Sequence, residues 1–216
     1  MLRRALVAIV LFEIAFIAAA GTGLSVFRDL SAVVFNIGFA LWLGMEAARV
    51  RLGHNNNAKT FGTFSRIFLI VSFACVFVAV WERGNGYPIF AEPLPAASVY
   101  IGVGLFIVGI YLRHLSIKQL GKYFVTKVQI TDDHELVTTG LYARIRHPSY
   151  TGLILGFLGA ILFLQAPLAV VIFVMLGVPA YIYRIKVEEQ VLLLRTFGRQ
   201  YESYMRRTCA LIPYIY

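Results

Sequence analysis

Residues 150–183 read YTGLILGFLGAILFLQAPLAVVIFVMLGVPAYIY and contain no charged side chain. The segment holds two apolar runs, 150–164 and 167–183, which meet at Gln165 and Ala166. Each run is near the length that a helix needs to cross a hydrocarbon core of about 30 Å. So short a connection predicts a tight helical hairpin, whose second helix returns the chain to the face of the membrane that it left.

Four further apolar runs of similar length precede this hairpin. In the whole chain 59% of the residues are hydrophobic and only 14% are charged, which lies outside the usual mix of soluble domains. We therefore predict an all-α integral membrane protein with about six transmembrane helices, built as a single membrane domain over residues 1–216. The four additional spans are expected at residues 5–24, 32–48, 67–81 and 98–113.

The positive charges predict the orientation of these spans. If the N-terminus is cytosolic, 18 of the 20 lysine and arginine residues fall on the inner side, and only Arg28 and Arg83 fall outside. This bias predicts that both termini are cytosolic, and it explains the net charge of +9 without a nucleic-acid partner. Arg3 and Arg4 also resemble the start of a secretory signal, but Glu13 interrupts the apolar run and further spans follow, which favours a retained helix.

Several site types find no support in the sequence. Cys75 and Cys209 are the only cysteines, so neither a disulfide framework nor a cysteine metal cluster is expected. His54 and His114 have no companions at metal-ligand spacing. We therefore predict no metal site.

Glycines in the run at 98–113 invite comparison with nucleotide-binding motifs. Gly102, Gly104 and Gly109 lack the strand, turn and helix context of a dinucleotide fingerprint, so no Rossmann domain is expected. Small residues in a transmembrane helix more often allow a second helix to approach closely. We predict that all three glycines serve helix packing.

Two polar stretches lie between or after the spans. Residues 113–149 form the longest polar loop, and loops of this kind often carry function. Residues 186–207 repeat apolar side chains at helical spacing with charges between them, which predicts an amphipathic C-terminal helix at the membrane surface.

The start of the fifth span carries the sequence RHPSY, from Arg146 to Tyr150. One interpretation is a plain helix start, because proline suits the first turn, arginine can reach the headgroups and tyrosine suits the interface. The other is a binding site for an anionic carboxylate, since a helix N-terminus offers free N–H groups and the positive end of its dipole. The motif alone is compatible with both.

A second polar cluster follows the sixth span. Arg184 and Glu188 have the spacing of an ordinary surface ion pair, worth a few tenths of a kcal/mol, and Glu189 is adjacent. Because the hairpin returns the chain to the face it left, we predict that these residues lie beside His147 and Tyr150 in one site.

Carboxylates also occur in the early spans. Glu46 is expected to reach the headgroups or to pair with Arg49 or Arg113, whereas the role of Glu13 stays open.

These motifs belong to a longer pattern in the second half of the chain. From Leu112 onward the sequence resembles the isoprenylcysteine carboxyl methyltransferase family, including the prokaryotic-type members of that family. The resemblance implies an S-adenosylmethionine-dependent methyltransferase that releases S-adenosylhomocysteine. It also implies that residues 112–216 form the cofactor-binding and catalytic portion, with residues 1–111 on the lipid-substrate side. The matching positions are His134, Leu136, Val137, Gly140, Tyr142, Arg146 to Tyr150, Gly152, Glu188, Glu189, Phe197, Gly198, Tyr201, Tyr204 and Pro213.

The resemblance also implies roles for individual residues. Arg184 would bind the substrate carboxylate, and Glu188, Glu189 and Arg146 would complete the catalytic group. The residues implied in cofactor binding are Gln129, His134, Glu135, Leu136, Val137, Tyr142, His147, Pro148, Ser149, Tyr150 and Glu188.

The expected reaction is carboxyl O-methylation of an isoprenylcysteine, or a similar lipid-linked carboxylate, at the cytosolic face of the membrane. A prokaryotic plasma membrane is favoured over the endoplasmic reticulum as its location. Such a carboxylate is already ionised at neutral pH and needs no general base. Phospholipid amine N-methylation would instead need a base, for which Glu188 or Glu189 is the candidate. The sequence is also compatible with a nicotinamide-dependent membrane reductase of similar helical architecture, and with a non-enzymatic scaffold or transporter.

Overall fold

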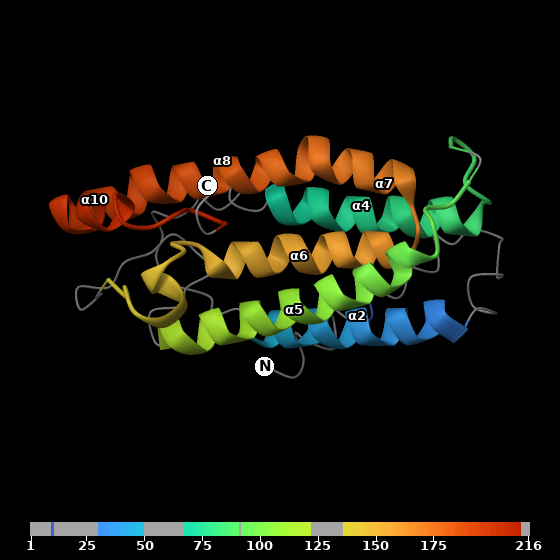
Figure 1. Cartoon of the computed structure of the whole chain (residues 1–216), viewed down its shortest axis with the longest axis horizontal. Helices are drawn as coiled ribbons and strands as arrows, with labels where there is room; N and C mark the ends of the chain where they lie inside the picture. Colours follow the sequence, from blue (N-terminus) through green and yellow to red (C-terminus); the bar gives the residue numbers. More distant parts are fainter. Residues whose placement is uncertain (1–9, 11–29, 50–66, 91, 122–135, 213–216) are drawn as a thin grey trace.

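A computed structural model describes residue 10 and residues 30–49, 67–90, 92–121 and 136–212. These residues form helices and connecting segments, and strand-like pairing among them is confined to one isolated bridge. The helices lie side by side along the long axis of the molecule (Figure 1). The principal helices are α2 (Leu30–Arg49), α4 (Ile67–Gly84), α5 (Ala97–Leu120), α6 (Pro148–Phe163), α7 (Pro167–Ile172), α8 (Val178–Glu188), α9 (Leu194–Phe197) and α10 (Arg199–Met205).

Three stretches of the described chain are long and apolar enough to cross a membrane: Ile67–Gly84, Ala97–Leu120 and Pro167–Glu188. The third consists of α7, a π-helical turn η5 (Phe173–Gly177) and α8, which continue one another. Helices therefore occupy the runs predicted at 32–48, 67–81, 98–113, 150–164 and 167–183, whereas the run at 5–24 lies outside the described residues.

The predicted loop at 113–149 is shorter than expected because α5 extends to Leu120. In the described part of this loop, a 3₁₀ turn, η4 (Gly140–Ala143), precedes α6. The helix therefore ends seven residues later than the predicted run at 98–113, since a helix can continue beyond its apolar run where its polar side chains find partners.

Helices α5 and α6 approach each other through glycines. A Cβ atom added to Gly109 would lie 2.4 Å from the backbone nitrogen of Gly156, and one added to Gly102 would lie 2.5 Å from that of Phe163. The packing role predicted for Gly102 and Gly109 is confirmed. The prediction was wrong for Gly104, which faces open space because two residues along a helix turn a side chain by about 200°.

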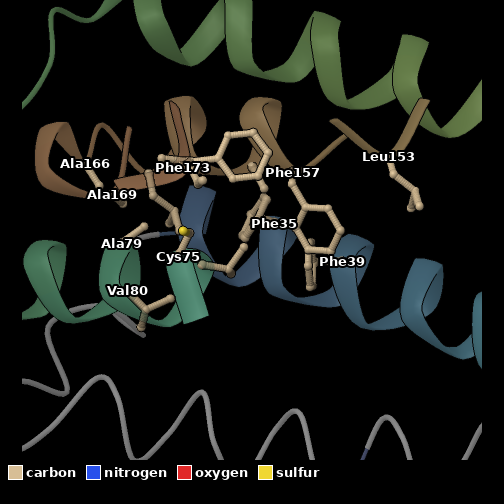
Figure 2. Packing of buried hydrophobic residues seen from close by; sticks show 14 of the residues in the cluster. Phe35, Phe39, Cys75, Ala79, Val80, Leu153, Phe157, Ala166, Ala169 and Phe173 are labelled. Atoms are coloured by element: carbon tan, nitrogen blue, oxygen red, sulfur yellow. The ribbon is translucent and has the colours of Figure 1, made fainter. Parts of the chain in front are cut away.

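The core between the helices is rich in aromatic rings. Phe39 and Trp42 of α2 pack edge-on at 5.3 Å, and Trp42 meets Phe157 of α6 at the same distance. Figure 2 shows Phe39 and Phe157 in this cluster, together with Cys75 of α4 and Phe173 of the hairpin's second arm. Because Cys75 is fully buried among apolar side chains, its thiol contributes to packing.

The predicted C-terminal helix differs from the structure in one respect. The last membrane helix runs on through a second π-helical turn, η6 (Glu189–Leu193), to the end of α9. It stops at Gly198, whose φ of +49° is readily adopted by glycine, and α10 then starts afresh. Beyond α10 the chain pairs with the segment before α6, where Cys209 accepts a hydrogen bond from the N–H of Arg146 at 2.8 Å.

Candidate functional site

The start of α6 and the end of α8 lie at the same end of the molecule, where α10 and the C-terminal segment also gather (Figure 1). His147 caps α6, and buried Pro148 occupies its first turn. The hydroxyl of Tyr150 donates to Glu188 Oε2 at 2.6 Å, and His147 Nε2 lies 3.1 Å from Glu189 Oε1. The predicted meeting of the two polar clusters is therefore confirmed.

Glu189 is the most heavily bonded acceptor of this cluster. Its Oε1 atom faces Arg146 Nε at 2.7 Å, His147 Nε2 at 3.1 Å and the hydroxyl of Tyr201 at 3.1 Å. Burial alone would raise the pKa of this carboxyl group, but the hydrogen bonds and charges of His147 and Arg146 outweigh it and lower the pKa to about 2. Glu189 is thus a carboxylate at all physiological pH values.

Arg146 uses its guanidinium group within the protein. Besides Glu189, its Nη1 donates to the backbone carbonyls of Met205, at 3.3 Å, and Thr208. These carbonyls lie at and just after the end of α10, where a helix leaves acceptors without internal partners. Arg146 therefore ties the C-terminal segment to Glu189.

Arg184 has an incomplete set of partners. Its Nη2 lies 3.1 Å from Glu188 Oε2, the same oxygen that Tyr150 contacts. The residue is only 6% exposed, and its Nε and Nη1 are buried without a hydrogen-bond partner in the described part of the chain. Leaving buried donors unpaired costs about 1 to 3 kcal/mol each, so such donors call for an acceptor from a ligand.

Arg113 links α5 to the start of α6. Its guanidinium forms an ion pair with Glu46 of α2 at 2.8 Å, which confirms one of the partners predicted for Glu46. Its Nη1 donates to the hydroxyl of Ser149. Ser149 is thereby held next to Tyr150 and His147.

The segment before α6 is anchored by tyrosines. Tyr142 is 5% exposed; its carbonyl accepts from the hydroxyl of Tyr204 at 2.6 Å, and its own hydroxyl donates to the carbonyl of Ser116 at 3.4 Å. Burial raises the pKa of the Tyr142 hydroxyl, which stays a neutral donor. Leu136 and Val137 are half-buried in this segment. Gln129, His134 and Glu135, also predicted to bind the cofactor, lie outside the described residues.

Known proteins share this segment of the chain. A family model described as the isoprenylcysteine carboxyl methyltransferase (ICMT) family matches residues 102–194. This segment of the chain therefore resembles the isoprenylcysteine carboxyl methyltransferase family. All the residues that the structure gathers from α5, α6 and α8 lie within the matched segment, whereas Glu46, Tyr201 and Tyr204 lie outside it.

Individual relatives show the same resemblance. A probable protein-S-isoprenylcysteine O-methyltransferase from Oryza sativa subsp. indica is 33% identical over 118 residues, which cover 54% of this chain and 61% of the relative. The protein-S-isoprenylcysteine O-methyltransferase of Saccharomyces cerevisiae is 36% identical over 117 residues, or 53% of this chain and 48% of the relative. The matched segment thus spans about half to three fifths of the length of these relatives.

The fold resembles that of a solved family member. The structure of a eukaryotic intramembrane Ras methyltransferase, isoprenylcysteine carboxyl methyltransferase, superposes with a TM-score of 0.53 over 98% of this chain and 94% of that chain. The two sequences are 21% identical, so this likeness concerns the fold. It extends the shared architecture beyond the matched segment to α2 and α4.

Some members of the site were not assigned a role from the sequence. Tyr201 is 1% exposed and donates to Glu189, and Tyr204 holds Tyr142, although both had served only as matching positions of the isoprenylcysteine carboxyl methyltransferase family. Their spacing of three residues places both on one face of α10, which was the available signal. The described residues contain no group of three histidine, cysteine or acidic side chains placed to hold a metal ion.

Proposed function

We propose that the protein is an S-adenosylmethionine-dependent methyltransferase that esterifies the carboxylate of an isoprenylcysteine or a similar lipid-linked acid. The observation that carries this proposal is the incomplete set of partners around buried Arg184. A substrate carboxylate would supply the acceptor oxygens that its Nε and Nη1 lack. The family of the matched segment, whose relatives are O-methyltransferases, supports the same reaction.

The residues near the start of α6 suit the proposed cofactor. The polar end of S-adenosylmethionine carries a carboxylate, which the N-terminus of α6 and the hydroxyl of Ser149 would bind together with His147 and Tyr150. Glu188 closes the same cluster. When bound, the cofactor supplies a methyl group on a positively charged sulfur. Its nucleoside part would lie against Leu136, Val137 and Tyr142, with Gln129, His134 and Glu135 as the further contacts that the family resemblance implies.

The chain's own residues then have a limited task. The acceptor carboxylate, of pKa about 4, arrives ionised, so Arg184 needs only to hold and orient it. Removing water from the site favours a reaction in which a cation and an anion give neutral products. Alignment of the two reactants supplies the remainder of the rate enhancement.

The state of the two glutamates favours a carboxylate acceptor over a phospholipid amine. Methylation of an amine requires a base that removes a proton from an ammonium group. Glu189, with a pKa of about 2, is too weak a base for this role, and Glu188 is engaged by Tyr150 and Arg184. No feature of the described site favours a nicotinamide-dependent reductase.

We further propose that the chain crosses the membrane six times and presents this site to the cytosol. In Figure 1 the C-terminal ends of α2, α5 and α8 point to the same end of the molecule as the N-terminal ends of α4 and α6. Of the lysine and arginine residues that the structure describes, all but Arg83 belong to segments at that end. Residues 1–111 would form the lipid-substrate side of a single membrane domain and residues 112–216 its cofactor side, in the plasma membrane of a prokaryote.

The experiment is a methylation assay on the purified full chain in detergent, with labelled S-adenosylmethionine and a farnesylcysteine analogue. We expect the methyl product to be hydrolysed by base, because it is an ester. A base-stable product on a lipid amine would contradict the carboxylate acceptor. Thermal stabilisation by a reduced nicotinamide but not by S-adenosylhomocysteine would contradict the proposal that the protein is a methyltransferase.

A further inference from the structure

A buried ion pair joins α2 to α5 close to the start of α6. Arg113 is 8% exposed, and its Nη2 lies 2.8 Å from Glu46 Oε2. Its Nε also donates to both carboxylate oxygens of Glu46, at 3.2 and 3.3 Å. A guanidinium group held at two of its nitrogens cannot rotate about its last bonds, so Glu46 fixes the direction of the third nitrogen, Nη1.

That third nitrogen donates to the hydroxyl of Ser149. A serine hydroxyl has two lone pairs and one proton, and a guanidinium group can only donate. Arg113 therefore occupies a lone pair of Ser149 and turns its proton toward another acceptor. No acceptor for that proton is present in residues 30–49, 67–90, 92–121 and 136–212.

Ser149 lies in the first turn of α6, where the helix dipole also favours an anion. An O–H group that is available as a donor at this position complements a carboxylate. Buried Arg184, with its two unpaired nitrogens, lies in the same cluster through Glu188 and Tyr150. Three independent features of this end of the molecule thus call for anionic ligand atoms.

We propose that Glu46 and Arg113 are positioning residues that orient the Ser149 hydroxyl toward the carboxylate of bound S-adenosylmethionine. This inference rests on the proposed function. Glu46 belongs to α2 and lies outside residues 102–194, the segment that matches the family model. The proposal therefore gives α2 a part in cofactor binding. The ion pair then acts on affinity for the cofactor and leaves the chemistry at Arg184 unaltered.

The test is a double-mutant cycle on the full chain in detergent, read as the Kd of S-adenosylhomocysteine. Ser149→Ala removes the donor to a charged group and should weaken binding about tenfold. Glu46→Gln loosens Arg113 and should weaken binding about threefold in the native background but leave the Ser149→Ala protein unchanged. The matched control is Met45→Leu, an exposed neighbour on α2 that should bind as the native chain does.

A merely structural ion pair would give a different result. In that case Glu46→Gln would lower the thermal midpoint and weaken binding by the same factor in both backgrounds, which would overturn the proposal. Steady-state kinetics provide a second readout: KM for S-adenosylmethionine should rise in Glu46→Gln while kcat and the KM of the acceptor stay within twofold. A native chain that does not bind S-adenosylhomocysteine would contradict the proposed function itself, whereas binding with additive variants would contradict only the positioning role.

Arg113→Lys is the alternative variant for this binding test if Glu46→Gln does not fold. Lysine keeps a positive charge opposite Glu46 but lacks the planar fork that reaches Ser149. We expect Arg113→Lys to weaken binding about as much as Ser149→Ala, with no further loss when the two are combined. Full additivity of these two changes would also overturn the proposal.

Discussion

The two ends of the α6–α7 hairpin each bury a charged side chain, and the two are satisfied in different ways. At the turn end, Glu82 of α4 is fully buried and accepts the backbone N–H groups of Leu168, at 3.1 Å, and Ala169, at 2.9 Å. At the open end, Arg184 is almost as deeply buried and forms an ion pair with Glu188, but two of its nitrogens have no hydrogen-bond partner in the described chain.

This difference distinguishes a charged side chain that stabilises the fold from one that can bind a ligand. The first N–H groups of a helix need acceptors and carry the positive end of its dipole, so Glu82 completes the start of α7. A complete set of partners gives stability and leaves nothing for a ligand. An incomplete set costs stability in the free protein, and this cost is offset when a ligand brings the missing acceptors.

The largest effect is expected at the open end. Arg184→Gln should lower kcat/KM for the lipid carboxylate by about a hundredfold or more, as does removal of a group that stabilises charge in other active sites. The thermal midpoint in detergent should change little, because two unpaired donors disappear with the charge. The control is Tyr183→Phe, an exposed neighbour. If Arg184→Gln lost as much free energy of unfolding as it lost in transition-state stabilisation, the proposed difference between the two ends would be contradicted.

The turn end should respond in the opposite sense. Glu82→Ala leaves two buried N–H groups without acceptors, and we expect a loss of about 3 kcal/mol in the free energy of unfolding. The protein that remains folded should bind S-adenosylhomocysteine with native affinity. Glu92→Ala, in the exposed loop that follows, should be neutral by comparison. A specific loss of cofactor affinity in Glu82→Ala would show that the turn end also has a role in binding.

The next effect concerns the close contact between α5 and α6. Gly109→Ala places a methyl group against the backbone of Gly156, so we expect a loss of about 2 kcal/mol from overpacking. Gly104→Ala enters open space on the same helix and should be neutral or slightly stabilising, since alanine is the better helix former. Thermal midpoints of the two variants measure this difference, and equal values would refute the close approach.

The smallest effect concerns the ionisation of Glu189. Its pKa of about 2 in the folded protein lies below the ordinary value of about 4.3, so the carboxylate stabilises the fold above that ordinary value. This contribution should be lost progressively as the pH falls from about 5 toward 2. We expect the midpoint difference between the native chain and Glu189→Gln to shrink over this range. Glu202→Gln, on the exposed side of α10, should show no such trend.

The sequence predicted the open end better than the turn end. His147 and Glu189 were expected to meet because a short hairpin must return to one face, and that argument needs only run lengths and a tight turn. Glu82 received no role, since it follows an apolar run directly and has the sequence context of any loop residue. Its burial depends on how α4 lies against α7, which no pattern within either segment encodes.

Hydrophobic run length and the spacing of polar clusters are local properties of the chain, and by themselves they determined the helices and the pairing of RHPSY with Arg184, Glu188 and Glu189. The tertiary structure alone decided which donors those residues keep free. Gly104 faces outward while Gly109 packs, Arg113 reaches Ser149, and Arg184 retains two unpaired nitrogens because each helix settles at one rotation about its axis. That rotation is selected by packing among all the helices together.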